Sequence, residues 1–203
     1  MKKQVVLVKG GEAKENYKDF YDFLEKQEFN PYKEVKKRWN RNMGETLGED
    51  YEVLEIPIFD KYFADYKSWK IMFEKVFPFL NGDVIFVGHS MGAIFLAKYF
   101  DEENNSELLE QTKKIILVAP PFKDIEGDVL GTFNFKNTNF KKLKNIQEKI
   151  IIFGSKDDFV VPFNDIKDYR KVLSKAEYKI FEKYGHFLGE EVPEIIEEIK
   201  KIL

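Results

Sequence analysis

Ser90 has the sequence surroundings of a nucleophile. It is the central residue of a Gly-His-Ser-Met-Gly segment at 88–92. An apolar run at 84–87 predicts a buried strand before this segment, and the apolar stretch 93–100 predicts a helix after it. A strand, Gly-x-Ser-x-Gly and a helix in this order form the pattern of a nucleophile elbow, which would let Ser90 attack a carbonyl. The simpler alternative is a glycine-rich turn with an unreactive serine, so partners elsewhere in the chain must decide.

A serine nucleophile needs a base, because an alcohol is scarcely ionised at neutral pH, and histidine is suited to that role. The chain has two histidines, His89 and His186. His89 is adjacent to Ser90 on a turn where successive side chains diverge, so we expect it to be a bystander. His186 lies in a Gly-His-Phe segment at 185–187 and is the predicted base; the alternative is a plain surface-loop histidine.

The base in turn needs an acid that holds the imidazole in the correct tautomer. Asp157 and Asp158 both follow the apolar run 150–153, and both qualify by position. Only one of them can face His186; the other would then be an exposed turn residue or a helix cap. The chain order serine, aspartate, histidine is that of α/β-hydrolases.

Backbone N–H groups must stabilise the negative charge that develops on the attacked carbonyl oxygen. Met91 follows the nucleophile at the start of the predicted helix, where the helix dipole adds to the effect. Gly10 and Gly11 follow the first predicted strand and could supply the second donor, with Gly11 preferred. A plain strand-to-helix turn is the alternative for this glycine pair.

Strands that alternate with helices must position these residues. We expect an α/β fold, a three-layer α/β/α sandwich with a mostly parallel six-stranded sheet of order 2-1-3-4-5-6. The second and sixth strands are amphipathic, as edge strands can be. Ligands of such sheets bind beyond the carboxyl ends of the strands, so the predicted site residues should meet at one edge. The predicted strands are 5–8, 51–56, 84–87, 115–118, 150–153 and 177–181, and the predicted helices are 16–28, 31–42, 68–77, 93–100, 164–173 and 193–203.

Length and composition narrow the class of protein further. A chain of 203 residues fits a single domain, with a lengthened first crossover at about 26–50 and a small cap-like segment at about 120–146. The net charge of −3 does not suggest a nucleic-acid partner. The absence of cysteine excludes disulfides and thiolate chemistry, and no metal or cofactor is expected. No apolar stretch suits a secretion signal or a membrane span, which favours a cytoplasmic protein without a membrane partner.

The chain resembles the small α/β-hydrolases of the retinoblastoma-binding protein 9 / YdeN-like serine hydrolase group. The matching segments are 83–92, 115–120, 154–162 and 185–187, and the resemblance is good over about 80–203. In that family the catalytic acid is the second aspartate of such a pair, which favours Asp158. The resemblance also implies a compact α/β-hydrolase fold. The chain lacks the Leu-x-Cys-x-Glu motif, so retinoblastoma binding is not carried over.

Two expectations concern the substrate pocket. Many relatives carry His-Gly after the first strand, whereas this chain has Lys9 before its glycine pair, and a cation there could favour anionic acyl groups. Phe133, Phe135 and Phe140 lie in the cap-like segment and could form an acyl pocket, although they could equally pack in the core.

The predicted activity is that of a serine hydrolase, resembling a carboxylesterase. It would cleave a small-molecule acyl substrate, a carboxylic ester or thioester, through an acyl-enzyme. A weakly active or inactive binding module on the same fold is the alternative, since fold does not determine function. Thioesterase, peptidase and lyase chemistry stay open, as does the oligomeric state.

Overall fold

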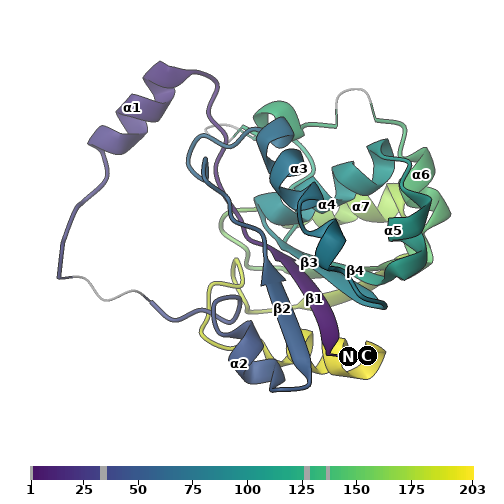
Figure 1. Ribbon diagram of the computed structural model, residues 1–203. Helices are drawn as coiled ribbons and strands as arrows, with labels where there is room; N and C mark the ends of the chain where they lie inside the picture. Colours follow the sequence, from purple (N-terminus) through teal and green to yellow (C-terminus); the bar gives the residue numbers. More distant parts are fainter. Residues whose placement is uncertain (1, 33–35, 126–128, 136–137) are drawn as a thin grey trace.

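The computed structural model describes residues 2–32, 36–125, 129–135 and 138–203 (Figure 1). Its centre is a six-stranded sheet in which every neighbouring pair of strands is parallel. The strand order is β2-β1-β3-β4-β5-β6, which confirms the order predicted from the sequence. The strands are β1 Lys3–Val8, β2 Tyr51–Glu55, β3 Val84–His89, β4 Thr112–Val118, β5 Ile150–Ser155 and β6 Glu177–Phe181.

Helices cover both faces of the sheet because the central strands are apolar on both faces. Alternate residues of these strands belong to two separate hydrophobic clusters, one on each side. Helices α3, α4, α5, α6 and α7 contribute to the first cluster, and α2 and α8 to the second. Their bounds are α2 Met43–Leu47, α3 Tyr66–Glu74, α4 Met91–Glu102, α5 Ser106–Gln111, α6 Lys141–Asn145, α7 Phe163–Val172 and α8 Pro193–Ile202.

The connection from β1 to β2 differs from the expected one. Helix α1 (Tyr17–Glu25) is shorter than the predicted 16–28; it has no buried residue and lies outside the three layers (Figure 1). The predicted helix 31–42 is wrong, because the described residues at 31–32 and 36–42 form turns and irregular backbone. The physical reason is that Trp39 is hydrogen-bonded to another loop and not within a helix. Its backbone N–H donates to the Gly189 carbonyl, and its indole N–H donates to the Phe187 carbonyl.

The segment expected to form a cap packs largely on the body of the protein. Its described part contains a short 3₁₀ helix, Gly131–Phe133, and helix α6, both in contact with α4. Lys98 of α4 reinforces this contact by donating hydrogen bonds to the carbonyls of Thr132 and Asn134. Residues 126–128 and 136–137 of the segment lie outside the described part of the chain.

Candidate active site

Ser90 lies at a sharp turn between β3 and α4. Its backbone has φ 55° and ψ −122°, a strained conformation for a residue with a side chain. The flanking glycines are required by close packing. A Cβ on Gly88 would lie 2.4 Å from the Gly92 carbonyl oxygen, and a Cβ on Gly92 would lie 2.1 Å from the Val8 carbonyl oxygen. This is the geometry of a nucleophile elbow.

His186 and Asp158 form a buried pair beside this turn. The Nδ1 atom of His186 lies 2.9 and 3.1 Å from the two carboxylate oxygens of Asp158. Their side chains are only 6% and 3% exposed. The carboxylate also accepts hydrogen bonds from the backbone N–H groups of Val160 and Val161, each at 2.9 Å, which orient it.

Asp157 faces a different set of partners, so the structure separates the two candidate acids. One of its carboxylate oxygens accepts from the Ser155 hydroxyl at 2.6 Å and from the Gly185 N–H at 2.8 Å. These two hydrogen bonds, the first being the stronger cause, lower the pKa of Asp157. Asp157 therefore ties the end of β5 to the residue before His186, while Asp158 is the carboxylate in contact with the imidazole.

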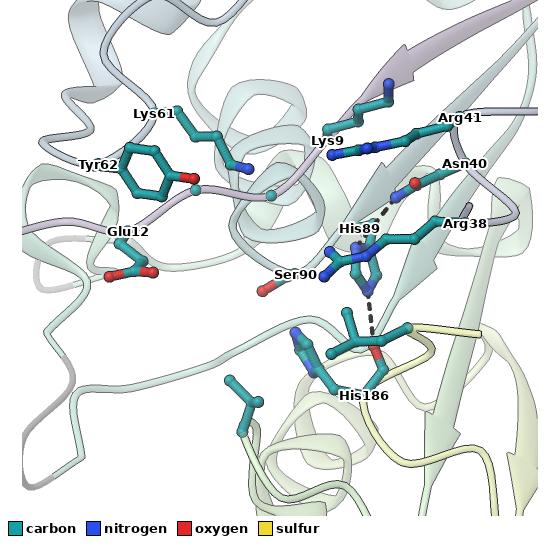
Figure 2. Close-up of a pocket in the computed structure, with 14 residues that line it drawn as sticks. Lys9, Glu12, Arg38, Asn40, Arg41, Lys61, Tyr62, His89, Ser90 and His186 are labelled. Carbon is teal, nitrogen blue, oxygen red and sulfur yellow. Dashed lines mark hydrogen bonds between the residues drawn. The ribbon is translucent and has the colours of Figure 1, made fainter. Parts of the chain in front are cut away.

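Ser90 and His186 line the same cavity (Figure 2). Within the described part of the chain, the Ser90 hydroxyl makes no hydrogen bond to the imidazole. Such bonds are often long in unliganded active sites and shorten when substrate binds.

His89 has a defined role that the sequence interpretation missed. It does not face Ser90; instead its Nε2 lies 2.9 Å from the His186 carbonyl oxygen and its Nδ1 lies 3.5 Å from the Asn40 amide nitrogen. Because a carbonyl can only accept, Nε2 carries the proton and Nδ1 accepts from Asn40. Burial and then the nearby charge of His186 lower the pKa of His89 to about 3. His89 therefore stays neutral and supports the backbone of His186.

The glycine pair is closely packed, and Gly10 lies directly against Ser90. A Cβ on Gly10 would lie 3.1 Å from the Cβ of Ser90, and a Cβ on Gly11 would lie 2.7 Å from the Lys61 carbonyl oxygen. Only glycine therefore fits this approach without displacing a neighbour. Met91 is the first residue of α4, so its N–H has no acceptor within the helix. The structure thus brings the predicted oxyanion donors to the neighbourhood of Ser90.

Two cavities adjoin Ser90. The first, of about 310 Å³, is lined by His186 and by several basic side chains. The second, of about 410 Å³, is lined by Met91, by further apolar side chains and by the charged Glu12 and Lys14. Gly11, Glu12 and Val160 border both. The other residues of the first cavity are Lys9, Gly10, Arg38, Asn40, Arg41, Lys61, Tyr62, His89 and Leu188; those of the second are Lys14, Pro121, Ile125, Leu130, Phe159 and Val161.

The expected pocket phenylalanines are in the core, so this interpretation needs correction. Phe133 is fully buried and packs edge-on against Trp69, with ring centroids 4.9 Å apart. Phe135 and Phe140 are in contact with each other, at 4.9 Å, and both lie against Phe122. All three are buried members of the first hydrophobic cluster, so the packing alternative describes them. From the same segment, Pro121, Ile125 and Leu130 border Ser90 instead.

The sequence interpretation also missed the contribution of residues 38–41. Arg38, Asn40 and Arg41 line the first cavity, and the buried Trp39 between them is anchored to the loop that carries His186. The available signal was a tryptophan inside a strongly charged segment, because a large apolar side chain there indicates a buried contact and not a solvent-exposed helix. Lys9 does line the cavity, as expected, but it forms an ion pair with Glu55 at 2.6 Å.

No cluster of histidine, aspartate and glutamate side chains in the described residues could hold a metal ion. Likewise, none of the helices in this part of the chain has the length and apolar character to cross a membrane.

Comparison with known proteins supports a hydrolase fold. The serine hydrolase family model matches residues 32–203. YdeN of Bacillus subtilis (strain 168) is 27% identical over 113 residues, which cover 55% of this chain and 57% of YdeN, so the match spans little more than half of that relative. The solved structure of the ydeN gene product from B. subtilis is similar with a TM-score of 0.69 at 18% identity, over 98% of both chains.

Two further solved structures share the fold. The thioesterase domain from the curacin biosynthetic pathway has a TM-score of 0.64 at 11% identity, over 98% of this chain and 91% of that one. Est1E from Butyrivibrio proteoclasticus has a TM-score of 0.58 at 13% identity, over 98% of this chain and 86% of that one. The family match covers most of the chain and includes the Ser90, Asp158 and His186 segments. The chain therefore belongs to the serine hydrolase family.

Proposed function

We propose that this protein hydrolyses a small carboxylic ester or thioester through an acyl-enzyme, with Ser90, His186 and Asp158 as its catalytic triad. The observation that carries the proposal is the His186–Asp158 pair, because His186 lines the same cavity as a serine held on a strained elbow. The thioesterase domain and Est1E share only the fold with this chain and do not decide between the two substrate classes.

In the proposed reaction, His186 Nε2 takes the proton from Ser90 as Oγ attacks the substrate carbonyl. Asp158 holds the proton on Nδ1 and stabilises the imidazolium. Backbone N–H groups of Met91 and Gly11, with Gly10 beside them, bind the developing oxyanion. The leaving alcohol or thiol departs with the proton from His186, and water then cleaves the acyl-Ser90 ester by the same steps.

A fluorophosphonate probe tests the proposal directly, because it reacts with activated serines. We expect the wild-type protein to be labelled, and Ser90→Ala and His186→Ala to be unlabelled while remaining folded. Ser174→Ala, which removes an exposed serine elsewhere, should be labelled like the wild type. A folded wild-type protein that takes up no probe and cleaves no ester would contradict the proposal and favour a binding module.

A further inference from the structure

Positive charge gathers around the cavity that Ser90 and His186 share. Lys9, Arg38, Arg41 and Lys61 line it, against one acidic residue, Glu12. The chain as a whole carries a net charge of −3, so this excess belongs to the site and not to the overall composition. Figure 2 shows the guanidinium groups of Arg38 and Arg41 entering the cavity from one side and the Lys61 ammonium group from the other.

Part of this charge is already neutralised within the protein. Lys9 pairs with Glu55 at 2.6 Å, and Glu12 pairs with Lys14 at 2.9 Å. Within the described residues, no carboxylate lies in ion-pair distance of Arg38, Arg41 or Lys61. The side chain of Arg41 contacts the Lys36 carbonyl at 3.4 Å, and the ammonium group of Lys61 lies over the Tyr62 ring at 5.1 Å. The cavity therefore carries a positive charge that an anionic ligand could balance.

The backbone that carries the two arginines is held in place by the residues between them. Trp39, 2% exposed, donates its indole N–H to the Phe187 carbonyl at 2.9 Å and its backbone N–H to the Gly189 carbonyl at 3.1 Å. The buried Asn40 contacts His89. Residues 38–41 are thus fixed to the loop of the catalytic base, which places the arginines at the cavity before any ligand arrives. Guanidinium groups suit carboxylate and phosphate, which they bind in a bidentate manner.

The position of His186 indicates which half of the substrate enters this cavity. In acyl transfer the imidazole gives its proton to the leaving group, so the leaving group must lie beside the imidazole. His186 lines the cationic cavity and not the second cavity. Apart from Glu12 and Lys14, which pair with each other, the charged side chains at Ser90 belong to the cationic cavity, and the second cavity adds apolar side chains such as Ile125 and Leu130. The leaving group would therefore occupy the cationic cavity and the acyl group the second cavity.

We infer that the substrate is an acyl ester or thioester whose leaving group carries a carboxylate or phosphate, bound by Arg38 and Arg41 with Lys61 opposite. This inference rests on the proposed function. In the reaction, the bond from Ser90 Oγ to the acyl carbon forms and the bond from that carbon to the leaving oxygen or sulfur breaks. The leaving group takes the proton from His186 and departs as an alcohol or thiol that retains its anionic substituent.

Matched aryl butyrates test the inference. In 3-carboxyphenyl butyrate the leaving group is anionic, and in 3-carbamoylphenyl butyrate it is neutral and of similar size. We expect wild-type kcat/KM to be about tenfold or more higher for the anionic ester, since charge-assisted hydrogen bonds are roughly twice as strong as neutral ones. An aryl butyrate that carries a phosphate group on the ring in place of the carboxylate shows which of the two anions is preferred.

The ratio of kcat/KM for the anionic ester to kcat/KM for the neutral ester should fall towards one in Arg38→Gln and in Arg41→Gln. It should fall most in the double variant. Because the preference compares two substrates on the same protein sample, a general loss of folded protein cancels. Lys201→Gln removes an exposed cation at the end of α8 and should keep the wild-type preference. Added salt should reduce the preference by screening.

A second pair places the charge on the acyl group, with phenyl hydrogen succinate compared with phenyl succinamate. A preference for the anionic acyl group in place of the anionic leaving group would overturn the assignment of the two cavities. Cleavage of neutral esters without any preference for anions would overturn the inference and leave the hydrolase intact. If the folded protein shows no turnover and no fluorophosphonate labelling, the proposed function is overturned, and the inference with it.

Discussion

The buried His89 should make this protein sensitive to acid in a way that a single substitution can remove. Burial, followed by the charge of His186, lowers its pKa from the usual 6.5 to about 3 in the folded state. In the unfolded chain the imidazole regains its ordinary pKa. Between these two values the unfolded state binds more protons than the folded state. The stabilisation is therefore complete above the unfolded pKa and is lost as the pH falls from there towards the folded pKa.

The size of the effect follows from the lowered pKa. A pH of 5 lies about 1.5 units below the pKa of the unfolded imidazole, which is then mostly protonated, while the folded imidazole is still neutral. One unit corresponds to about 1.4 kcal/mol, so His89 alone should reduce the free energy of unfolding by about 2 kcal/mol between pH 8 and pH 5.

Urea unfolding at pH 8 and pH 5 measures this quantity. His89→Gln replaces the titrating ring with an amide that can still donate to the His186 carbonyl. The drop in the free energy of unfolding from pH 8 to pH 5 should be about 2 kcal/mol smaller in the variant than in the wild type. Carboxylate titrations are common to both proteins and cancel in this difference, and Ser174→Ala should behave like the wild type. Equal drops in wild type and His89→Gln would refute the reasoning, because His89 would then not be held neutral by burial.

Three further substitutions probe the site and its support. Asp158→Asn should lower kcat on a neutral ester by about 10³- to 10⁴-fold by favouring the wrong tautomer of His186, whereas Asp157→Asn should keep most of the activity; equal losses would contradict the assignment of the acid. Phe133→Ala should lower the free energy of unfolding by about 3–5 kcal/mol without changing the preferred acyl-chain length, and a change in that preference would return Phe133 to the pocket. Gly92→Ala should abolish folding or lower Tm sharply, because the added Cβ would lie 2.1 Å from the Val8 carbonyl oxygen. Gly44→Ala, whose Cβ would meet its nearest neighbour at 3.8 Å, is the matched control, and similar Tm values for the two would refute the packing argument.

The sheet could be predicted because its signals are local. Runs of apolar residues such as 84–87 and 115–118 can be buried only on a sheet covered on both faces, and the segments between them are long enough for helical crossovers. The amphipathic segments 51–56 and 177–181 then belong at the edges, where the structure places β2 and β6. The predicted helix 31–42 failed because the tertiary contacts of Trp39 outweigh the local preference of a charged segment.

Residue types alone narrowed the candidate site to a few positions. The chain offers two histidines, and Gly-x-Ser-x-Gly occurs between a strand and a helix, so Ser90 and His186 could be named before any coordinates. Two adjacent aspartates could not be separated by local geometry, and the family resemblance was needed to prefer Asp158. The structure places Asp158 at 2.9 Å from His186 and turns Asp157 to Gly185.

The amino-acid sequence by itself determined the strands, their order and the elbow around Ser90, because these depend on apolar patterns and on glycines next to one another in the chain. Only the tertiary structure decided the chemistry of the surrounding cavity. Residues 38–41 reach the site through a hydrogen bond between Trp39 and a carbonyl 148 positions away. Phe133 packs in the core against Trp69 and Phe135 against Tyr169, aromatic partners from other elements. Contacts between residues so far apart in the chain depend on how whole layers pack, so a local pattern of residue types does not predict them.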